Sequence, residues 1–354
     1  MRNLLFAFAL TAALNLPAEA ASLPQEADFV ARDFKFASGE MLPELKLHYI
    51  TLGTLQRDAN GHATNAVLML HGTTGTGKNF LSPSLAGSLF GAGQPLDTEK
   101  YFIILPDGIG RGGSSKPSDG LRTKFPHYGY NDMVTAQHAI VAEALGIEHL
   151  RLIVGTSMGG MQSWLWAERY PDMADGIMPV ASQPVAATGR NYIWRLMIID
   201  AIRSDPDWKD GNYTSPPSHF VKTLPLFNVM TGSPRTLEAN GKSQTETRAT
   251  LDKLVADYGK SIDANDYLYW FTAIDDYNPE PELGKIKSKI YAVNFADDLL
   301  NPVQLGKMDL IMPKVAGGKF VIVPEGPDTI GHQTLTQAKV WAPYLTRLIE
   351  DLPK

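Results

Sequence analysis

One stretch near the middle of the chain predicts a strand, a sharp turn and a helix in close succession. Leu150–Val154 is a short apolar run typical of a buried strand, and Met158–Tyr170 has the spacing of a helix that Pro171 ends. Between them, Gly155-Thr-Ser-Met-Gly159 has the form G-x-S-x-G. Small flanking residues let the strand and helix approach closely, and the turn lifts the serine hydroxyl above the sheet edge. The stretch therefore predicts Ser157 as a nucleophile.

Apolar runs recur along the chain and alternate with helical patterns, which is typical of a mainly parallel sheet flanked by helices. In residues 183–284 this rhythm stops, and helical patterns at Tyr192–Ser204 and Ser243–Tyr258 take its place. We therefore expect an α/β core in residues 21–182 and 285–354, with 183–284 as a helical insertion that covers the sheet. The strands that the apolar runs predict are Tyr49–Leu55, Ala66–Leu70, Tyr101–Pro106, Leu150–Val154, Gly176–Val180, Ile290–Phe295 and Phe320–Val323.

The first twenty residues have the form of a secretory signal peptide. Arg2 precedes the short apolar run Leu4–Leu14, and Ala18-Glu-Ala20 supplies the small residues of a cleavage site. The run is too short to span a bilayer, and no other segment of the sequence is long and apolar enough. We therefore expect a signal peptide in residues 1–20 and a periplasmic or secreted protein that is not inserted in a membrane.

The charge and the cysteine content exclude several classes of function. The 354 residues carry a formal net charge of −6 and no run of Lys or Arg, so we expect no nucleic-acid partner. The chain has no cysteine, which excludes disulfides, thiolate metal sites and a cysteine nucleophile. We expect neither a metal nor a cofactor, and the expected partner is a small-molecule acyl ester.

A serine nucleophile needs a general base and an acid that orients the base. After a strand–serine–helix motif of this kind, the acid and then the histidine follow in the chain. Asp298 and His332 come after the last two expected strands, so they fall on loops at the same sheet edge as Ser157. Asp297 is a close rival, but the D-x-x-x-P spacing to Pro302 favours Asp298. The sequence therefore predicts Ser157, His332 and Asp298 as nucleophile, base and orienting acid.

Two glycine-rich stretches have the form of phosphate-binding motifs. From Gly72 the chain reads G-x-x-x-x-G-K-N, but Asn79 stands where a P-loop has the Ser or Thr that holds Mg²⁺. Gly108–Gly113 reads G-x-G-x-x-G, but the loop sequence Ser114–Asp119 follows it where a dinucleotide site needs a helix. We therefore interpret both stretches as turns that follow strands of the sheet.

A longer motif around the serine, Ser157-Met-Gly-Gly-Met-Gln162, is more specific than G-x-S-x-G. The stretches that accompany it are Asp132–Gln137, Leu145–Leu150 and Tyr170-Pro171. Together they resemble the homoserine O-acetyltransferase branch of the α/β-hydrolase superfamily, and the resemblance extends from about Phe34 to the C-terminus. It implies an α/β-hydrolase fold with a mostly parallel eight-stranded sheet, a helical lid at 183–284, and a possible homodimer through that lid. It also implies a triad at Ser157, Asp298 and His332.

In this fold the chain turns sharply under the substrate after His71-Gly72, at the end of a central strand. The resemblance therefore implies an oxyanion hole made by the backbone N–H groups of Met158 and Thr73, with Thr74 as the alternative to Thr73. Backbone donors that the fold holds in place need no reorganisation as charge develops. One such donor stabilises the transition state by about 3 kcal/mol.

Two positions depart from the family pattern. The family places an arginine that holds the substrate carboxylate on the helix before the D-P-D-W stretch, where this chain has Ile199. Arg195 and Arg203 lie nearby and are the candidates to replace it. The family also tends to place an acid directly after the catalytic histidine, where this chain has Gln333. Acetyl-CoA, in addition, is a cytoplasmic metabolite that an exported enzyme does not meet.

We therefore expect an exported serine hydrolase that cleaves a carboxylic ester or related acyl bond through an acyl-enzyme, with water as the final acceptor. The alternative is an O-acyltransferase of the homoserine O-acetyltransferase type, which moves the acyl group to a small hydroxyl acceptor. Two further alternatives are a nucleotide-binding protein that uses Gly72–Lys78 and a catalytically inactive binding protein on the same fold.

Overall fold

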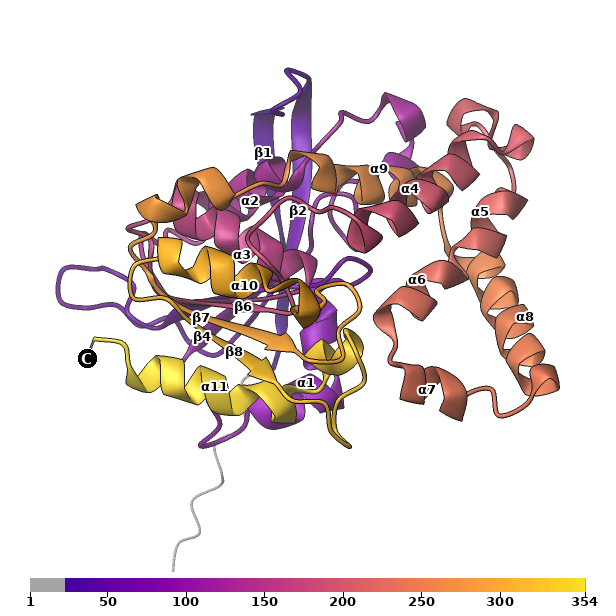
Figure 1. The fold of residues 1–354 in the computed structure, drawn as a ribbon. Helices are drawn as coiled ribbons and strands as arrows, with labels where there is room; N and C mark the ends of the chain where they lie inside the picture. Colours follow the sequence, from indigo (N-terminus) through magenta and orange to yellow (C-terminus); the bar gives the residue numbers. More distant parts are fainter. Residues whose placement is uncertain (1–22, 354) are drawn as a thin grey trace, which may run out of the picture.

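The computed structural model describes residues 23–353, and the expected signal peptide in residues 1–20 lies outside them. Within the described residues, no helix is both long and apolar enough to cross a membrane. This part of the chain forms an eight-stranded, mostly parallel sheet with helices on both faces and a helical insertion that extends to one side (Figure 1). The expected fold class is therefore confirmed.

The strand order in the sheet is β1-β2-β4-β3-β5-β6-β7-β8. The strands are β1 (Gln25–Lys35), β2 (Met41–Leu52), β3 (Ala66–Leu70), β4 (Phe102–Pro106), β5 (Leu150–Thr156), β6 (Ala174–Val180), β7 (Lys289–Phe295) and β8 (Lys319–Val323). β3 to β8 pair in parallel, whereas β1 with β2 and β2 with β4 pair antiparallel. Since parallel strands point the same way, the loops after β3, β5, β7 and β8 meet at one edge of the sheet.

The sequence patterns do not predict β1, and they place the start of β2 too late. β1 lies at the sheet edge and most of its side chains are exposed, so it lacks the apolar run that marks a central strand. β2 begins at Met41 rather than Tyr49 for the same reason, because most side chains in its first half are also exposed. It ends at Leu52, before Gly53, whose φ of 78° breaks the extended backbone.

Two apolar cores lie on opposite faces of the sheet. Buried side chains of β3 alternate between them, with Leu68 in one core and Val67 and Met69 in the other. The first core is covered by α2 (Tyr130–Ala139), α3 (Met158–Arg169) and α10 (Lys307–Ile311), and the second by α1 (Pro83–Leu89) and α11 (Ala338–Glu350). α2 continues as a π-helical turn at Ile140–Ala144.

The chain between β6 and β7 is helical and forms the insertion, which we call the lid. Its helices are α4 (Arg190–Arg203), α5 (Ser218–Thr223), α6 (Pro225–Thr231), α7 (Pro234–Ala239), α8 (Gln244–Ser261) and α9 (Ala264–Thr272). The lid has an apolar cluster of its own, which includes Ile198, Phe220 and Phe271. In Figure 1, α4 and α9 adjoin the core, whereas α5 to α8 project from it.

Candidate active site

Ser157 occupies the sharp turn between β5 and α3. Its φ of 53° and ψ of −114° place it in a region that non-glycine residues rarely adopt. The backbone holds this turn, because Ser157 N donates to Val180 O at 2.8 Å and Met161 N donates to Ser157 O at 2.8 Å. A Cβ added at Gly159 would lie 2.0 Å from the carbonyl oxygen of Leu70. The glycine of the motif is therefore required for the helix to pack this closely on β3.

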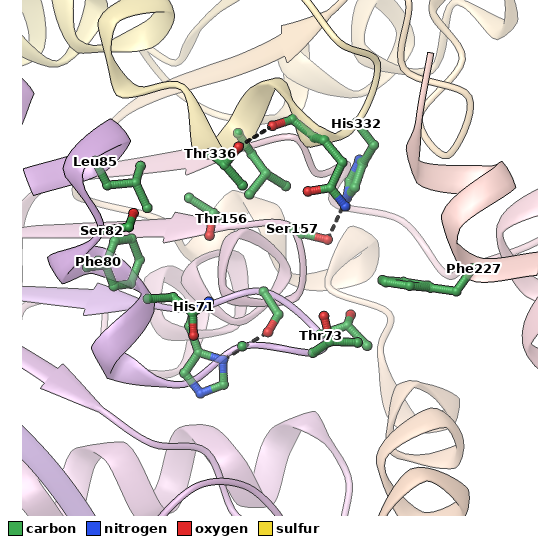
Figure 2. Close-up of a pocket in the computed structure, with 16 residues that line it drawn as sticks. His71, Thr73, Phe80, Ser82, Leu85, Thr156, Ser157, Phe227, His332 and Thr336 are labelled. Atoms are coloured by element: carbon green, nitrogen blue, oxygen red, sulfur yellow. Dashed lines mark hydrogen bonds between the residues drawn. The ribbon is translucent and has the colours of Figure 1, made fainter. Parts of the chain in front are cut away.

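The three residues predicted as a triad lie together, joined by two short hydrogen bonds. Ser157 Oγ is 2.7 Å from His332 Nε2, and His332 Nδ1 is 2.7 Å from Asp298 Oδ2. Figure 2 shows the first of these contacts, with the histidine above the serine hydroxyl. His332 and Asp298 are 3% and 1% exposed, so solvent does not compete for the bond between them. This is the geometry in which an imidazole can take a proton from a serine hydroxyl.

Asp298 is held as a buried carboxylate by the start of its own loop. Oδ1 accepts from the backbone N–H groups of Leu300 at 2.8 Å and Asn301 at 3.2 Å, and the Asn301 amide donates to Oδ2 at 2.9 Å. Burial acts to raise the pKa of Asp298, but the charge of His332 and these hydrogen bonds outweigh it and lower the pKa. Asp298 therefore stays ionised and keeps the proton of the histidine on Nδ1.

Asp297, the rival acid, has a different partner. Its Oδ2 accepts from the backbone N–H of Gly331 at 2.8 Å, one residue before His332. Gly331 has a φ of 69°, and a Cβ there would lie 2.9 Å from Gly232 C in the lid. Asp297 thus holds the loop that carries the histidine, while Asp298 contacts the imidazole. Sequence reasoning did not assign this role to Asp297, because it depends on a partner in a distant loop.

The turn after β3, residues 72–77, is fixed by His71. His71 Nε2 accepts from Gly108 N at 3.0 Å, so the ring proton is on Nδ1 and donates to Gly72 O at 2.9 Å. Burial lowers the pKa of His71, which favours this neutral form. Gly75 N also donates to Gly72 O, at 3.0 Å. We call this segment the Gly72 turn.

The Gly72 turn leaves a backbone donor directed away from its anchored carbonyl. In a trans peptide the N–H of Thr73 points opposite to the C=O of Gly72. Met158 begins α3, so its N–H has no partner within the helix. Within residues 23–353, neither N–H group donates to another group of the protein. The oxyanion role of Thr73 and Met158 stays a prediction, which this arrangement supports, and Thr74 remains its alternative.

A cavity of about 150 Å³ lies beside these groups. Its lining joins Ser157, His332 and the Gly72 turn to apolar side chains of the core and one lid residue, Phe227. In Figure 2, Leu85 and Phe80 lie on one side of Ser157 and Phe227 on the other. Among the described residues that line the cavity, none is Asp, Glu, Lys or Arg. Gln333 also lines it, whereas Ile199 and the arginines near it do not.

Arg195 and Arg203 do not replace the missing arginine at this cavity. Arg195 is 3% exposed, and its guanidinium carbon lies 4.5 Å from the ring centroid of Trp194 in the lid. Arg203 is exposed at the end of α4. Ile199 is 2% exposed and packs in the apolar cluster of the lid. The described lining of the pocket beside Ser157 therefore contains no carboxylate, ammonium or guanidinium group.

Comparison with known proteins agrees with the resemblance found in the sequence motifs. Residues 65–321 match the family model described as the alpha/beta hydrolase fold. A homoserine O-acetyltransferase from Moorella thermoacetica is 32% identical over 358 residues, which span 89% of this chain and 94% of that protein. Another from Haemophilus influenzae is 29% identical over 330 residues, 83% of this chain and 89% of that protein.

Among solved structures, that of the acetyl esterase MekB superposes with a TM-score of 0.78 at 25% identity, covering 92% of this chain and 97% of that one. The family predicted from the motif around Ser157 is thus confirmed by sequence and by structure. The chain belongs to the alpha/beta hydrolase fold family, in its homoserine O-acetyltransferase-like branch.

Proposed function

We propose that this protein is a serine esterase that hydrolyses small, uncharged carboxylic esters. The observation that carries the proposal is the uncharged cavity of about 150 Å³ beside Ser157 and His332. An engineered cavity of about this volume holds one benzene molecule, so the site fits a short acyl group better than a long one.

The mechanism proceeds in two half-reactions. In the first, His332 Nε2 accepts the proton of Ser157 as Oγ attacks the ester carbonyl carbon, and Asp298 stabilises the imidazolium. The N–H groups of Thr73 and Met158 hold the oxyanion, and His332 returns the proton to the leaving alkoxide as the acyl-enzyme forms. In the second, His332 takes a proton from water, the hydroxide attacks the acyl carbon, and Ser157 leaves with that proton.

The lack of charge in the cavity argues against an amino-acid acceptor. Homoserine carries a carboxylate and an ammonium group, and each loses hydration on entering a cavity that offers it no charged partner. Where the family has the arginine that holds the substrate carboxylate, the chain has Ile199, which is buried in the lid, and the residue after His332 is the uncharged Gln333. An uncharged ester leaves no such group unpaired.

The second candidate is O-acyl transfer, which the relatives favour. The homoserine O-acetyltransferases from Moorella thermoacetica and Haemophilus influenzae are 32% and 29% identical to this chain, over 89% and 83% of its length. Transfer uses the same acyl-enzyme at Ser157 and differs only in the second acceptor, a hydroxyl group in place of water. The catalytic groups fit both reactions, so the acceptor distinguishes them.

The test is a product analysis with p-nitrophenyl esters of two to eight acyl carbons, with and without added homoserine or glycerol. We expect free acid as the main product under both conditions, with the highest kcat/KM for the shortest acyl groups. Acyl-homoserine or acyl-glycerol as the main product would establish the transferase instead. The Ser157→Ala variant is the control, and it should show neither turnover nor labelling by a fluorophosphonate.

We also propose that the protein is exported, on the pattern of Arg2, the apolar run after it and Ala18-Glu-Ala20. Fractionation of the producing cells, followed by N-terminal sequencing, tests this proposal. The expected N-terminus of the mature protein is Ala21, and an uncleaved protein in the cytoplasm would contradict it.

A further inference from the structure

The loop after β4 contains the glycine motif Gly108–Gly113, for which the proposed function supplies no role. Gly110 and Gly112 have φ values of 86° and 56°, which favour glycine. A Cβ at Gly110 would lie 1.9 Å from Tyr128 Oη, and one at Gly112 would lie 1.9 Å from Asp107 Oδ2. Both glycines are therefore needed for this loop shape, and the residue that they flank is Arg111.

Arg111 connects the Gly72 turn to the lid. Its Nη2 donates to the carbonyl oxygen of Thr74 at 2.6 Å. Its guanidinium carbon lies 5.4 Å from the ring centroid of Tyr267 and 5.9 Å from that of Trp270, both on α9. Among the described residues, Arg111 forms no ion pair, and its buried Nε has no hydrogen-bond partner. The guanidinium contacts are thus one carbonyl of the turn and two rings of the lid.

The same loop holds the Gly72 turn at two further points. Gly108 N donates to His71, which in turn donates to Gly72 O, and Asp107 Oδ1 accepts from Gly77 N at 2.7 Å. The His71 ring also lies parallel to the ring of Trp270, with centroids 6.0 Å apart. Arg111 holds the middle of the turn through the carbonyl of Thr74, one residue after Thr73.

We propose that Arg111 is a positioning residue that fixes the Gly72 turn for oxyanion stabilisation. Through its contacts with Tyr267 and Trp270, it also couples the position of the turn to the packing of α9 on the core. The proposal rests on the proposed function, in which the Thr73 N–H holds the oxyanion. If the Thr74 carbonyl is released, this N–H shifts relative to Ser157 while the rest of the cavity is unchanged. Transition-state stabilisation then falls, but ground-state binding does not, because the ester carbonyl does not yet carry the charge.

The test compares Arg111→Met and Arg111→Lys with the wild type, using p-nitrophenyl acetate and active-site concentrations from the end point of fluorophosphonate labelling. We expect Arg111→Met to lower kcat by about 10- to 100-fold while KM changes by less than about twofold. The kcat of Arg111→Lys should lie between those of the wild type and Arg111→Met, because an ammonium group can still donate to Thr74 O. A trifluoromethyl ketone, which forms a tetrahedral oxyanion on serine, should bind more weakly to Arg111→Met by a similar factor.

Arg122 supplies a matched control. It also joins this region of the core to the lid, through a 3.1 Å bond from Nη1 to Asn212 Oδ1, but it does not contact the Gly72 turn. Arg122→Met should keep kcat within about twofold of the wild type, as expected for an exposed contact. An equal loss of kcat in both variants would show a general effect of lid contacts and would overturn the proposal.

The coupling to α9 is tested by a double-mutant cycle with Tyr267→Leu. If Tyr267 acts through Arg111, Tyr267→Leu lowers kcat in the wild type but has little further effect in Arg111→Met. Additive losses would overturn the coupling, and an Arg111→Met kcat within about twofold of the wild type would overturn the positioning role. If Arg111→Met does not fold, Arg111→Lys is measured in its place, and it should show a lower kcat with a nearly unchanged KM. A wild type that neither cleaves esters nor is labelled would instead refute the proposed function.

Discussion

At the scale of single residues, two neighbouring acids on one loop have separate partners. Asp298 accepts from the imidazole of His332, whereas Asp297 accepts from the backbone of Gly331. Asp298→Asn should lower kcat by about 10⁴-fold, because an amide at this position stabilises the wrong histidine tautomer. In Asp297→Asn the imidazole keeps Asp298 as its partner, so kcat should fall by about tenfold or less. Steady-state kinetics of the two variants on one ester measures the difference, and equal losses would contradict the assignment.

The backbone at Ser157 is strained. With φ at 53°, its Cβ is crowded by the backbone, and a glycine would remove that cost. Ser157→Gly and Ser157→Ala should both be inactive, but the glycine variant should be more stable than the alanine variant by about 1 kcal/mol. Denaturant unfolding of the two variants measures this difference. A glycine variant of equal or lower stability would show that the turn is unstrained.

The sequence was informative about the reacting groups and much less so about the residues that position them. Ser157 has a local motif, and the order of the strands indicates where His332 and Asp298 should lie. His71 and Arg111 carry no such signal, because their partners come from loops far away in the chain. Only the folded arrangement of the loops after β3 and β4 brings these partners together.

At the scale of secondary-structure elements, helix α3 carries a titratable side chain that opposes folding. Burial and then nearby Glu282 raise the pKa of Glu168 to about 7, and its Oε2 has no hydrogen-bond partner among the described residues. In the unfolded chain the pKa of a glutamate is about 4.3. Between these two pH values the folded chain binds more protons than the unfolded chain, so this group lowers stability as pH rises.

Replacing this carboxyl should therefore stabilise the protein in a pH-dependent way. Glu168→Gln should raise Tm by about 2 °C or more at pH 8, and it should have much less effect at pH 4, where the carboxyl is mostly protonated in both states. Thermal unfolding at the two pH values measures this. Glu350→Gln, at the exposed end of α11, is the control and should change Tm at neither pH. An equal change at both pH values in Glu168→Gln would contradict the titration argument.

The elements that the sequence patterns predict best are those buried on both sides. β3 and α3 have the expected positions, because continuous apolar runs and a local motif mark them. β1 escapes prediction, since an edge strand needs little apolar surface and is held mainly by its antiparallel pairing with β2. Edge strands of this kind depend on a partner that local patterns do not reveal.

At the scale of the whole molecule, the cavity lies between the core and the lid, so its shape depends on both. Phe227 of α6 enters it from the lid (Figure 2). Phe227→Ala should raise kcat/KM for bulkier esters by about tenfold relative to the acetate, because the smaller side chain leaves space for a few more methylene groups of the substrate. A series of p-nitrophenyl esters measures the ratio. Val229→Ala, on the exposed side of the same helix, is the control and should leave this ratio of kcat/KM values unchanged. A similar change of the ratio in both variants would show that lid mobility, and not Phe227, sets the preference for short esters.

The packing of Gly331 against the lid backbone has a consequence for protein engineering. A Cβ at Gly331 would meet Gly232 and Ser233, in the linker between α6 and α7, at 2.9 Å. The loop that carries His332 and this linker are therefore shaped to each other without any side chain between them. A chimera that takes its insertion from another family member to obtain a new specificity inherits this constraint. The donor has to supply a linker of matching backbone path, or the exchange has to include the histidine loop, so that the two segments are transplanted as one unit.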